Sequence, residues 1–550
     1  MGRSDVAMRW TRAGRAALLG AALSLPASVV ARDAGAGAPT CASGRFATAT
    51  PLLPGSAPSG DVVEIAGAKI AIEGACGPAD VKRKATAAGT RVRATFQRCR
   101  GVPGKVKLRG VVDPSCQSFV ATLTAAKTRP RWKVTFSGAL DASIPTCAYL
   151  PGAPVAQPPA ELDARRRRLV PDTPRIQEGY FLALWNLVAT EYLYPDFHGV
   201  DWEAVRSDAL AQIRAGLSLE AFYELLAEVI EGLGDEHSYF APPEAARALR
   251  SELDGGEAFV GIGIAASRIE GENAATVLSV YPRSPAAAAG LAPHDVLVAV
   301  NGGPVFDEDG GWLTPEEEGA SYELTFERPG GGAQTVTVVR TLIGGFRPLE
   351  HCLIQGTRIA YLSVPTFFDA TLEERVRAIL RNLTAAETLD GLVLDLRVNA
   401  GGSAFVALPI LGFFTDGLQG EIVDRRGRFP LEVEAEDVGG SQSVPLVVLA
   451  GEGTVSFGEL ATGMLQLSGR ATVVGEPTAG NTEGLYGWIF RDGSEVWLAA
   501  AAFDPVGPLP AGAWEGVGVA PDVAVPSAWH LFTAADDPGL AQALELLTGP

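Results

Sequence analysis

A short apolar run followed directly by a helix-like pattern constrains the C-terminal half of this chain more than any other feature. Residues 445–450 (PLVVLA) have the composition of a buried β-strand, and Leu460, Met464 and Leu467 then follow at helical spacing. Ser456 lies between the two, where the pattern turns a strand into a helix. That position exposes a hydroxyl beside the positive end of a helix, where backbone N–H groups can stabilise an anion. The stretch is therefore compatible with a nucleophilic serine.

The same serine has a simpler interpretation as the N-cap of the helix. Glu459, three residues later, is the capping-box partner that such a serine requires. The two interpretations are compatible with each other. The choice between them depends on residues elsewhere in the chain.

The composition describes a large globular protein with room for about three or four domains. The chain has 550 residues, of which 47% are hydrophobic and 20% are charged, and its net charge is −19. Such an acidic chain argues against nucleic acid as the ligand of the whole protein. The charge is uneven, because residues 41–150 carry a net +10 whereas residues 151–550 carry −32. A basic module precedes a strongly acidic body.

The N-terminus has the pattern of an export signal. Arginines precede an apolar run at 16–30 that is too short to cross a bilayer, and small residues allow cleavage after Ala31. Pro26 interrupts the run, which argues against an uncleaved membrane anchor. We predict a signal peptide over residues 1–31, a periplasmic or extracellular location, and no later membrane-spanning segment.

The cysteines agree with an oxidising compartment. The sixth cysteine, Cys352, stands alone in the body, and the other five lie in the basic module: Cys41, Cys76, Cys99, Cys116 and Cys147. The chain has no CxxC pair, so a zinc or redox site has little support, and we expect disulfides, no metal and no cofactor. The odd number leaves one module cysteine unpaired unless it reaches elsewhere.

Residues 41–150 are predicted to form an all-β module. Short alternating runs are punctuated by Gly and Pro, and every second residue is basic in RVRATF (91–96) and KVKLRG (105–110). A solvated strand face is the simpler explanation of these charges. Adhesion to an anionic polymer of the cell envelope is the more specific hypothesis.

Four further segments follow the basic module. A Pro- and Arg-rich linker covers 151–175, and a helical region with capping residues Asp201 and Ser218 covers 176–252. A small β-rich domain is expected over 253–342. Residues 343–550 alternate strand and helix, which predicts an α/β layered core.

The β-rich segment resembles a PDZ domain. Its sequence contains VGIGI at 260–264 and SPAAAAGLAPHDVLVAVNG at 284–302. PDZ domains bind peptides by strand addition, with backbone N–H groups that receive the terminal carboxylate. The resemblance implies that the peptide lies along Val260, Gly261, Ile262, Gly263 and Ile264.

The body as a whole resembles the tail-specific, or C-terminal processing, serine peptidase family. Four motifs follow in order: YLYPDFHGVDW running into GDEHSYF, the PDZ-like segment, LDLRVNAGG (394–402), and the Ser456 stretch closing with WEGVGVAPDVAV. The resemblance implies a ClpP- or crotonase-like layered core with Ser456 as nucleophile. It implies an oxyanion hole formed by the N–H of Phe457 and that of Gly401 or Gly402.

The sequence departs from the Ser/Lys branch of that family. The lysine base expected 25 residues after the nucleophile is replaced by Asn481, which has no titratable amine. A second, tricorn-like branch pairs the serine with a histidine and a glutamate, and His237 and Glu515 occupy matching places. In that branch a serine precedes the histidine, whereas this chain has Glu236. Asp235 or Glu236 is therefore an alternative to Glu515 as the residue that orients the imidazole.

Three functions are compatible with these residues. The first is an exported serine endopeptidase that hydrolyses unfolded or C-terminal polypeptide segments through an acyl-enzyme on Ser456, with His237 as base. The second is an inactive protein on the same scaffold that binds peptide or a hydrophobic ligand. The third assigns the function to the basic module. We predict the peptidase, with polypeptide substrates and no nucleic acid partner.

Overall fold

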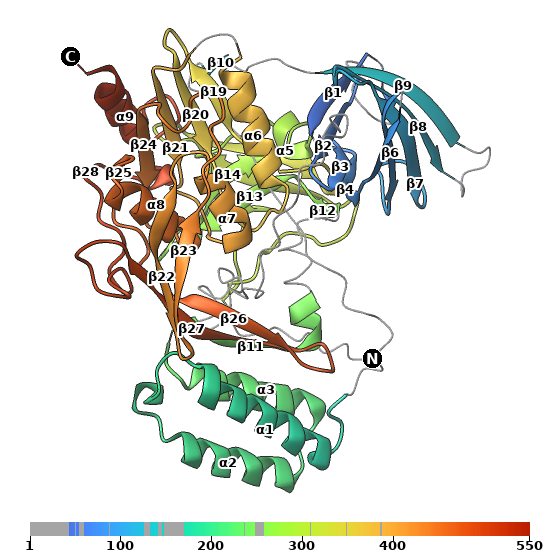
Figure 1. Ribbon diagram of the computed structural model, residues 1–550. Helices are drawn as coiled ribbons and strands as arrows, with labels where there is room; N and C mark the ends of the chain where they lie inside the picture. The colour runs from blue at the N-terminus through green and yellow to red at the C-terminus, as the bar shows by residue number, and fades with distance from the viewer. Residues whose placement is uncertain are drawn as a thin grey trace.

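The computed structural model describes residues 43–49, 51–53, 60–86, 88–125, 132–140, 146–147, 170–235, 237–247, 258–308, 310–347, 349–385 and 388–549. The predicted signal peptide and most of the predicted linker lie outside these residues. Figure 1 shows a β-sheet module at one side of a mixed α/β body and a helical bundle below that body. No helix among the described residues is long and apolar enough to cross a membrane.

The N-terminal module is a single antiparallel sheet with the strand order β4-β3-β2-β1-β9-β8-β7-β6-β5. Alternate residues of each strand are buried, so one face forms a core and the other faces solvent. The prediction of a β-rich module is confirmed, and the structure adds β1, β4 and β5. The strands are β1 (Gly44–Thr48), β2 (Val62–Ala66), β3 (Lys69–Ile72), β4 (Cys76–Asp80), β5 (Lys82–Thr86), β6 (Gly89–Phe96), β7 (Val106–Val112), β8 (Ser118–Ala125) and β9 (Trp132–Leu140).

A disulfide cross-links the module, and the cysteine of the body is also in a disulfide. Cys76 and Cys99 are bonded to each other, and Cys116 and Cys352 are also in disulfides. The partner of Cys352 is one of the remaining cysteines of residues 41–150, and one of these, Cys147, lies in a short strand that belongs to the sheet of the body. Cys352 therefore does not stand alone, contrary to the impression that the sequence gives.

The helical region folds as predicted. Its helices are α1 (Pro174–Glu191), α2 (Trp202–Ala215) and α3 (Leu219–Glu231). The side chain of Asp201 accepts a hydrogen bond from Ala204 N–H, and that of Ser218 accepts one from Ala221 N–H, so both predicted caps are present.

A twisted antiparallel ribbon connects the helices to the body, and the sequence did not predict it. The short strand β11 (Tyr239–Ala241) follows α3 and pairs with the long strand β27 (Glu495–Pro505). Val496 and Leu498 of β27 pack into the core of the helical bundle. The ribbon is completed by β22 (Gly417–Asp424), β23 (Gly427–Val433) and β26 (Gly484–Ile489).

The predicted small β domain contains two sheets. The strands β12 (Phe259–Gly261) and β18 (Thr341–Ile343) pair with each other and lead into and out of it. Its main sheet has the order β13-β14-β15-β16-β17, with the short helix α5 (Pro285–Ala288) after β14. The strands of the main sheet are β13 (Ile264–Arg268), β14 (Ala275–Val280), β15 (Val296–Val300), β16 (Ser321–Glu327) and β17 (Ala333–Val339).

The remaining part of the body is a mostly parallel sheet covered by helices on both faces. Its order is β10-β19-β20-β21-β24-β25-β28. Leu392 and Leu394 of β21 pack in the cluster that contains α6, α7 and α8, whereas Val393 packs in the cluster that contains α9. The elements are β10 (Thr146–Cys147), β19 (His351–Ile354), β20 (Ile359–Ser363), α6 (Leu372–Leu383), β21 (Gly391–Asp395), α7 (Ala404–Leu411), β24 (Leu446–Ala450), α8 (Phe457–Leu467), β25 (Thr472–Gly475), β28 (Val523–Ala524) and α9 (Pro538–Thr548). The predicted alternation of strand and helix is present, while the ClpP- or crotonase-like arrangement and the domain boundaries stay predictions.

Candidate active site

Ser456 lies in a strained turn between β24 and α8. Its backbone angles are φ 54° and ψ −123°, which a residue with a side chain rarely adopts. An N-cap residue normally has extended angles, so capping alone does not require this conformation. Strained backbone of this kind costs about 1–3 kcal/mol and persists only where the surroundings impose it. The turn therefore favours a functional serine over a simple cap.

Glu459 is the group that imposes this turn. The carboxylate is fully buried, and its Oε1 accepts hydrogen bonds from the N–H groups of Ser456 (3.1 Å) and Asn481 (2.8 Å). Its Oε2 accepts from Gly480 N–H (2.7 Å) and from the hydroxyl of Thr478. Burial raises the pKa of Glu459, although these four donors oppose the shift. The predicted capping-box glutamate thus also holds the loop that faces Ser456.

Gly401 lies directly against the side chain of Ser456. A Cβ added to Gly401 would be 2.7 Å from Ser456 Cβ and 3.2 Å from Ser456 Oγ. The Gly401 N–H, however, donates to Asn399 Oδ1 (2.9 Å) and is not free to bind an oxyanion. The N–H groups of Phe457 and Gly402 have no hydrogen-bond partner among the described residues. Of the two predicted glycines, Gly402 is therefore the better second donor, and Gly401 provides space.

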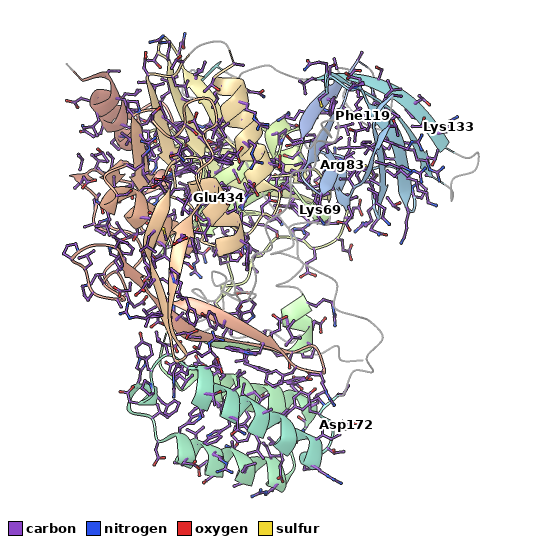
Figure 2. All side chains as sticks on the ribbon, viewed as in Figure 1. Lys69, Arg83, Phe119, Lys133, Asp172 and Glu434 are labelled. Atoms are coloured by element: carbon purple, nitrogen blue, oxygen red, sulfur yellow. A yellow bond between two sulfur atoms is a disulfide. The ribbon has the colours of Figure 1, made fainter. Side chains whose placement is uncertain are left out.

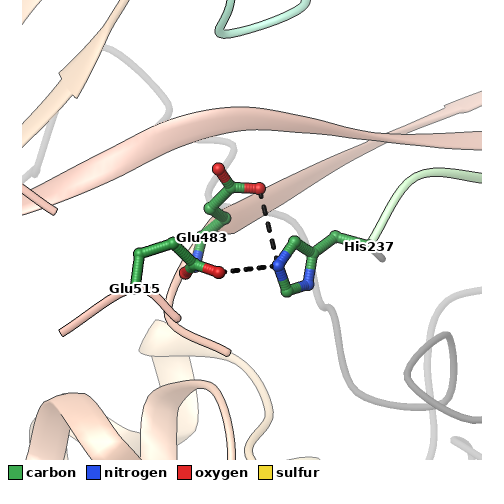
Figure 3. A group of neighbouring side chains, drawn as sticks. All are labelled: His237, Glu483 and Glu515. Carbon is green, nitrogen blue, oxygen red and sulfur yellow. Dashed lines mark hydrogen bonds and ion pairs between the residues drawn. The ribbon is translucent and has the colours of Figure 1, made fainter. Parts of the chain in front are cut away.

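His237 and Glu515 come together from segments 278 residues apart. Figure 3 shows that the ring nitrogen Nε2 of His237 faces two carboxylates. It lies 2.9 Å from Glu515 Oε1 and 3.7 Å from Glu483 Oε2. The other oxygen of Glu515 accepts hydrogen bonds from Thr482 N–H, Thr482 Oγ1 and Glu483 N–H. The predicted partnership of His237 with Glu515 is thus present as a direct hydrogen bond.

Glu483 belongs to the site, and the sequence did not identify it. The side chain is buried, and one carboxylate oxygen accepts a hydrogen bond from the hydroxyl of Tyr194. Its other oxygen, Oε2, has no hydrogen-bond partner. Burial raises the pKa of Glu483 to about 7, against the opposing effects of His237 and Tyr194. A glutamate next to the position of the missing lysine carried no motif that would have marked it.

The carboxylates control the charge of His237. Burial lowers its pKa, but the hydrogen bond to Glu515 and the charge of Glu483 outweigh burial and raise the pKa of His237 to about 9. For Glu515, burial raises the pKa, and the bond from His237 more than reverses that effect, so the pKa is lowered. In this state the imidazole is mostly protonated at neutral pH.

A two-residue bridge links the Ser456 turn to the His237–Glu515 pair. Asn481 C=O accepts a hydrogen bond from Ser456 N–H (2.9 Å), and the next residue, Thr482, donates to Glu515. Adjacent residues have Cα atoms about 3.8 Å apart, so the two halves are anchored to neighbouring points of one loop. No hydrogen bond joins Ser456 to His237 in the described part of the chain.

Asp235 and Glu236 were the alternatives to Glu515 for orienting the imidazole. Asp235 does not bond the imidazole ring. Its carboxylate instead accepts from the backbone N–H groups of His237 and Ser238 and from Ser238 Oγ. Glu236, the other alternative, lies outside the described residues.

The atoms His237 Nε2, Glu483 Oε2 and Glu515 Oε1 lie within 4.8 Å of one another, a spacing that a metal ion could also bridge. The hydrogen bond between His237 and Glu515 accounts for the arrangement without an ion.

The residues predicted to bind a peptide do not form one continuous free edge. Val260 and Gly261 belong to β12, where they pair with Leu342 and Thr341 of β18. The carbonyls of Ile262 and Gly263 accept hydrogen bonds from Ala286 and Tyr281. Ile264 begins β13, which lies at the edge of its sheet. β13 is thus the part of the predicted groove where a strand could be added.

Three protein families match this chain in the order that its elements follow. Residues 177–231 match the tricorn protease C1 domain, residues 276–317 match the PDZ domain, and residues 358–525 match peptidase family S41. The first match covers α1 to α3. The last covers both the Ser456 turn and Glu515.

Curated relatives are C-terminal processing proteases. The chain is 28% identical over 366 residues to carboxyl-terminal-processing peptidase 2 of Arabidopsis thaliana, which covers 64% of this chain and 69% of the relative. It is 27% identical to the carboxyl-terminal-processing protease of a Picosynechococcus strain, over 68% of this chain and 89% of the relative. Among solved structures, the photosystem II D1 C-terminal processing protease is similar over 64% of this chain and 93% of its own, with 24% identity and a TM-score of 0.47.

The matched families define a serine-type peptidase with a PDZ domain. Together with the C-terminal processing homologues, these matches support a C-terminal processing, PDZ-containing serine peptidase family and a tail-specific protease.

Proposed function

We propose that this protein is an exported endopeptidase that hydrolyses unfolded or C-terminal polypeptide segments, with Ser456 as nucleophile and His237 as general base. The observation that carries the proposal is the strained Ser456 turn with Gly401 against its side chain and the His237–Glu515 pair anchored one residue away. Asn481, at the place of the missing lysine, contributes its backbone to this arrangement and cannot act as a base.

In the proposed mechanism each group takes one step of acyl transfer. Glu515 holds Nε2–H of the neutral imidazole, so Nδ1 is the nitrogen with a free lone pair. Ser456 Oγ attacks the scissile carbonyl while Nδ1 takes its proton, and the oxyanion is bound by Phe457 N–H and Gly402 N–H. The imidazolium then protonates the leaving amine, and water, activated by the same nitrogen, hydrolyses the acyl-enzyme. The Ser456–His237 contact forms when substrate closes the site.

The proposed protein is exported and binds the tail of its substrate at the small β domain. The disulfides involving Cys76, Cys99, Cys116 and Cys352 favour an oxidising compartment, which supports the signal peptide expected over 1–31. The edge strand β13 offers a site where a substrate tail adds as a further strand.

Three alanine variants test the assignment against unfolded casein. We expect Ser456→Ala and His237→Ala to lower kcat/KM by about 10³-fold or more, and Asn481→Ala to stay within about 10-fold of wild type. His530→Ala, which removes a histidine outside the site, serves as the control. Wild-type activity in Ser456→Ala and His237→Ala, together with loss in Asn481→Ala, would show that a different base operates.

An inactive ligand-binding protein is the second candidate, and the missing Ser456–His237 hydrogen bond is the observation that favours it. Labelling with a fluorophosphonate separates the two. A peptidase should be labelled at Ser456, and His237→Ala should slow the labelling. A folded protein that binds peptide but is not labelled would support the alternative.

A further inference from the structure

Seven exposed cations lie on one face of the module sheet. In an antiparallel sheet, directly opposed residues point to the same face. The register places Lys82 opposite Arg93, and Arg93 opposite Arg109. The same face contains four more exposed cations, and we call the seven residues the cationic face: Lys82, Lys84, Arg91, Arg93, Lys107, Arg109 and Lys133. It spans β5 to β9, which is about 19 Å across four strand spacings.

The module bears this charge without compensation. Like charges placed directly opposite each other in a sheet are destabilising. The strands β5 to β9 contain no Asp or Glu, and none of the seven cations has an ion pair or a side-chain hydrogen bond with the described residues. The opposite face packs Val92, Phe96 and Leu108 into the core. The repulsion is thus confined to the solvent face, where a polyanion would relieve it.

Hydroxyl groups lie between the cations. Thr122 is opposite Arg109 and also opposite Thr135, whose hydroxyl is 3.0 Å away. Thr95 is opposite Lys107, and Thr124 is opposite both Lys107 and Lys133. The face therefore combines positive charge with threonine hydroxyls, which can donate and accept hydrogen bonds and so suit a ligand rich in hydroxyl groups.

We propose that the cationic face binds a linear acidic polysaccharide. Its cations repeat along and across the strands, so a ligand with charges at intervals can contact several at once. The aromatic side chains of β6 and β8, Phe96 and Phe119, are buried in the module core, so no described aromatic ring on these strands offers a stacking platform for nucleic acid bases. Val120 is the exposed large apolar residue of this face, which is too little for insertion into a membrane.

Lys133, on the strand β9 at one border of the cationic face, lies away from the catalytic body (Figure 2). In Figure 2, Lys133 lies at the outer side of the module, far from the helices and strands of the peptidase core. A bound polymer would hold the enzyme at an acidic matrix and leave the Ser456 region unobstructed. This inference goes beyond the proposed peptidase activity and does not depend on it.

The test is the binding of the full chain to polygalacturonate. We compare Arg93→Gln/Arg109→Gln with Arg175→Gln/Arg247→Gln, which removes the same charge from exposed arginines on helical segments elsewhere. At low salt (about 20 mM) we expect the first variant to bind at least about 10-fold more weakly, the second within about 2-fold of wild type, and wild-type binding to fall at about 300 mM salt. Thermal unfolding checks that both variants are folded.

Six results would overturn the proposal, and the first four concern binding to charged ligands. These are no binding by wild type at low salt, equal weakening in the two variants, equal or tighter binding to a single-stranded oligonucleotide, and tighter binding to phosphatidylglycerol vesicles. Binding to neutral dextran with equal affinity would also exclude it. Low-salt self-association that disappears in Arg93→Gln/Arg109→Gln would identify the acidic body of a second copy as the occupant and exclude the polysaccharide.

Discussion

At the scale of single residues, the site depends on the absence of a side chain at Gly401. A methyl group there would lie 2.7 Å from Ser456 Cβ, and φ at this residue is 78°. We expect Gly401→Ala to lower kcat by about 100-fold or more, because the serine must move from its turn. Gly417→Ala is a matched control, since its φ is 75° but no atom lies within 4 Å of the added Cβ. Both variants carry similar backbone strain, so equal activity in the two would contradict the role of Gly401.

Glu515, through its hydrogen bond, and then Glu483, through its charge, raise the pH at which His237 becomes a base. The raised pKa of His237, about 9, means that the neutral form needed for catalysis increases as pH rises toward that value. We expect kcat/KM to rise with pH up to about 9. Glu483→Gln removes a negative charge near the ring, which lowers the pKa of His237 and moves this limb to lower pH by about 1–2 units.

The control for this pH profile is Glu432→Gln, which removes an exposed charge of the ribbon strand β23 and should leave the rise of kcat/KM at the same pH. If Glu483→Gln left the pH dependence of kcat/KM unchanged, another group would control it.

The raised pKa of His237 also affects the stability of the folded protein. Because the pKa of His237 is raised in the folded state, its contribution to stability is present below its unfolded pKa and is lost as pH rises through about 9.

At the scale of elements, the pairing of β11 with β27 holds the segment that bears His237. Ser238, next to His237, accepts a hydrogen bond from Ala499 N–H of β27 (2.9 Å) and donates to Asp235 (2.8 Å). Ser238→Ala leaves a buried N–H unpaired, which costs about 1–3 kcal/mol of folding stability. We expect a larger fall in kcat than change in KM, since the histidine is misplaced while the peptide site is intact.

Rescue and control variants separate positioning from stability. Ser238→Thr keeps the hydroxyl and should restore most of kcat. Ser443→Ala removes an exposed hydroxyl that bonds only Gly440 C=O, and it should change neither stability nor kcat. If Ser238→Ala lost stability but kept kcat, the hydrogen bond between Ser238 and Ala499 would have a structural role only.

Strands and helices with a regular apolar pattern could be predicted from the sequence. Apolar runs such as β21 and β24, and amphipathic helices such as α3, were correctly predicted because burial on one or both sides leaves a period in the sequence. The ribbon of β22, β23, β26 and β27 was missed, because its residues pack partly on a distant helical bundle and partly face solvent. Glu483 was missed for the same reason, as its role arises from contacts across 246 and 289 residues.

At the scale of the whole molecule, the basic module contacts the small β domain and the core at once. Arg283 of the β domain pairs with Asp61 of the module (3.7 Å), and Arg100 of the module donates to Leu342 C=O of β18. On the core side, Arg375 of α6 pairs with Glu64 of the module (3.2 Å) and with Asp369 (3.1 Å). Through the module, these contacts tie the β domain to the core.

The buried part of this interface should dominate its stability. Arg375 of the core is buried, and Glu64 is its partner from the module, whereas the Arg98–Glu318 pair between the module and the small β domain is about half exposed on both sides. We expect Glu64→Gln to lower the free energy of unfolding by about 1–3 kcal/mol, because it weakens a desolvated charge pair. Glu318→Gln should change it by less than about 1 kcal/mol, since solvent and salt screen an exposed pair. Equilibrium urea unfolding with the disulfides intact measures both, and equal effects would mean that the buried pair adds no more stability than the exposed one.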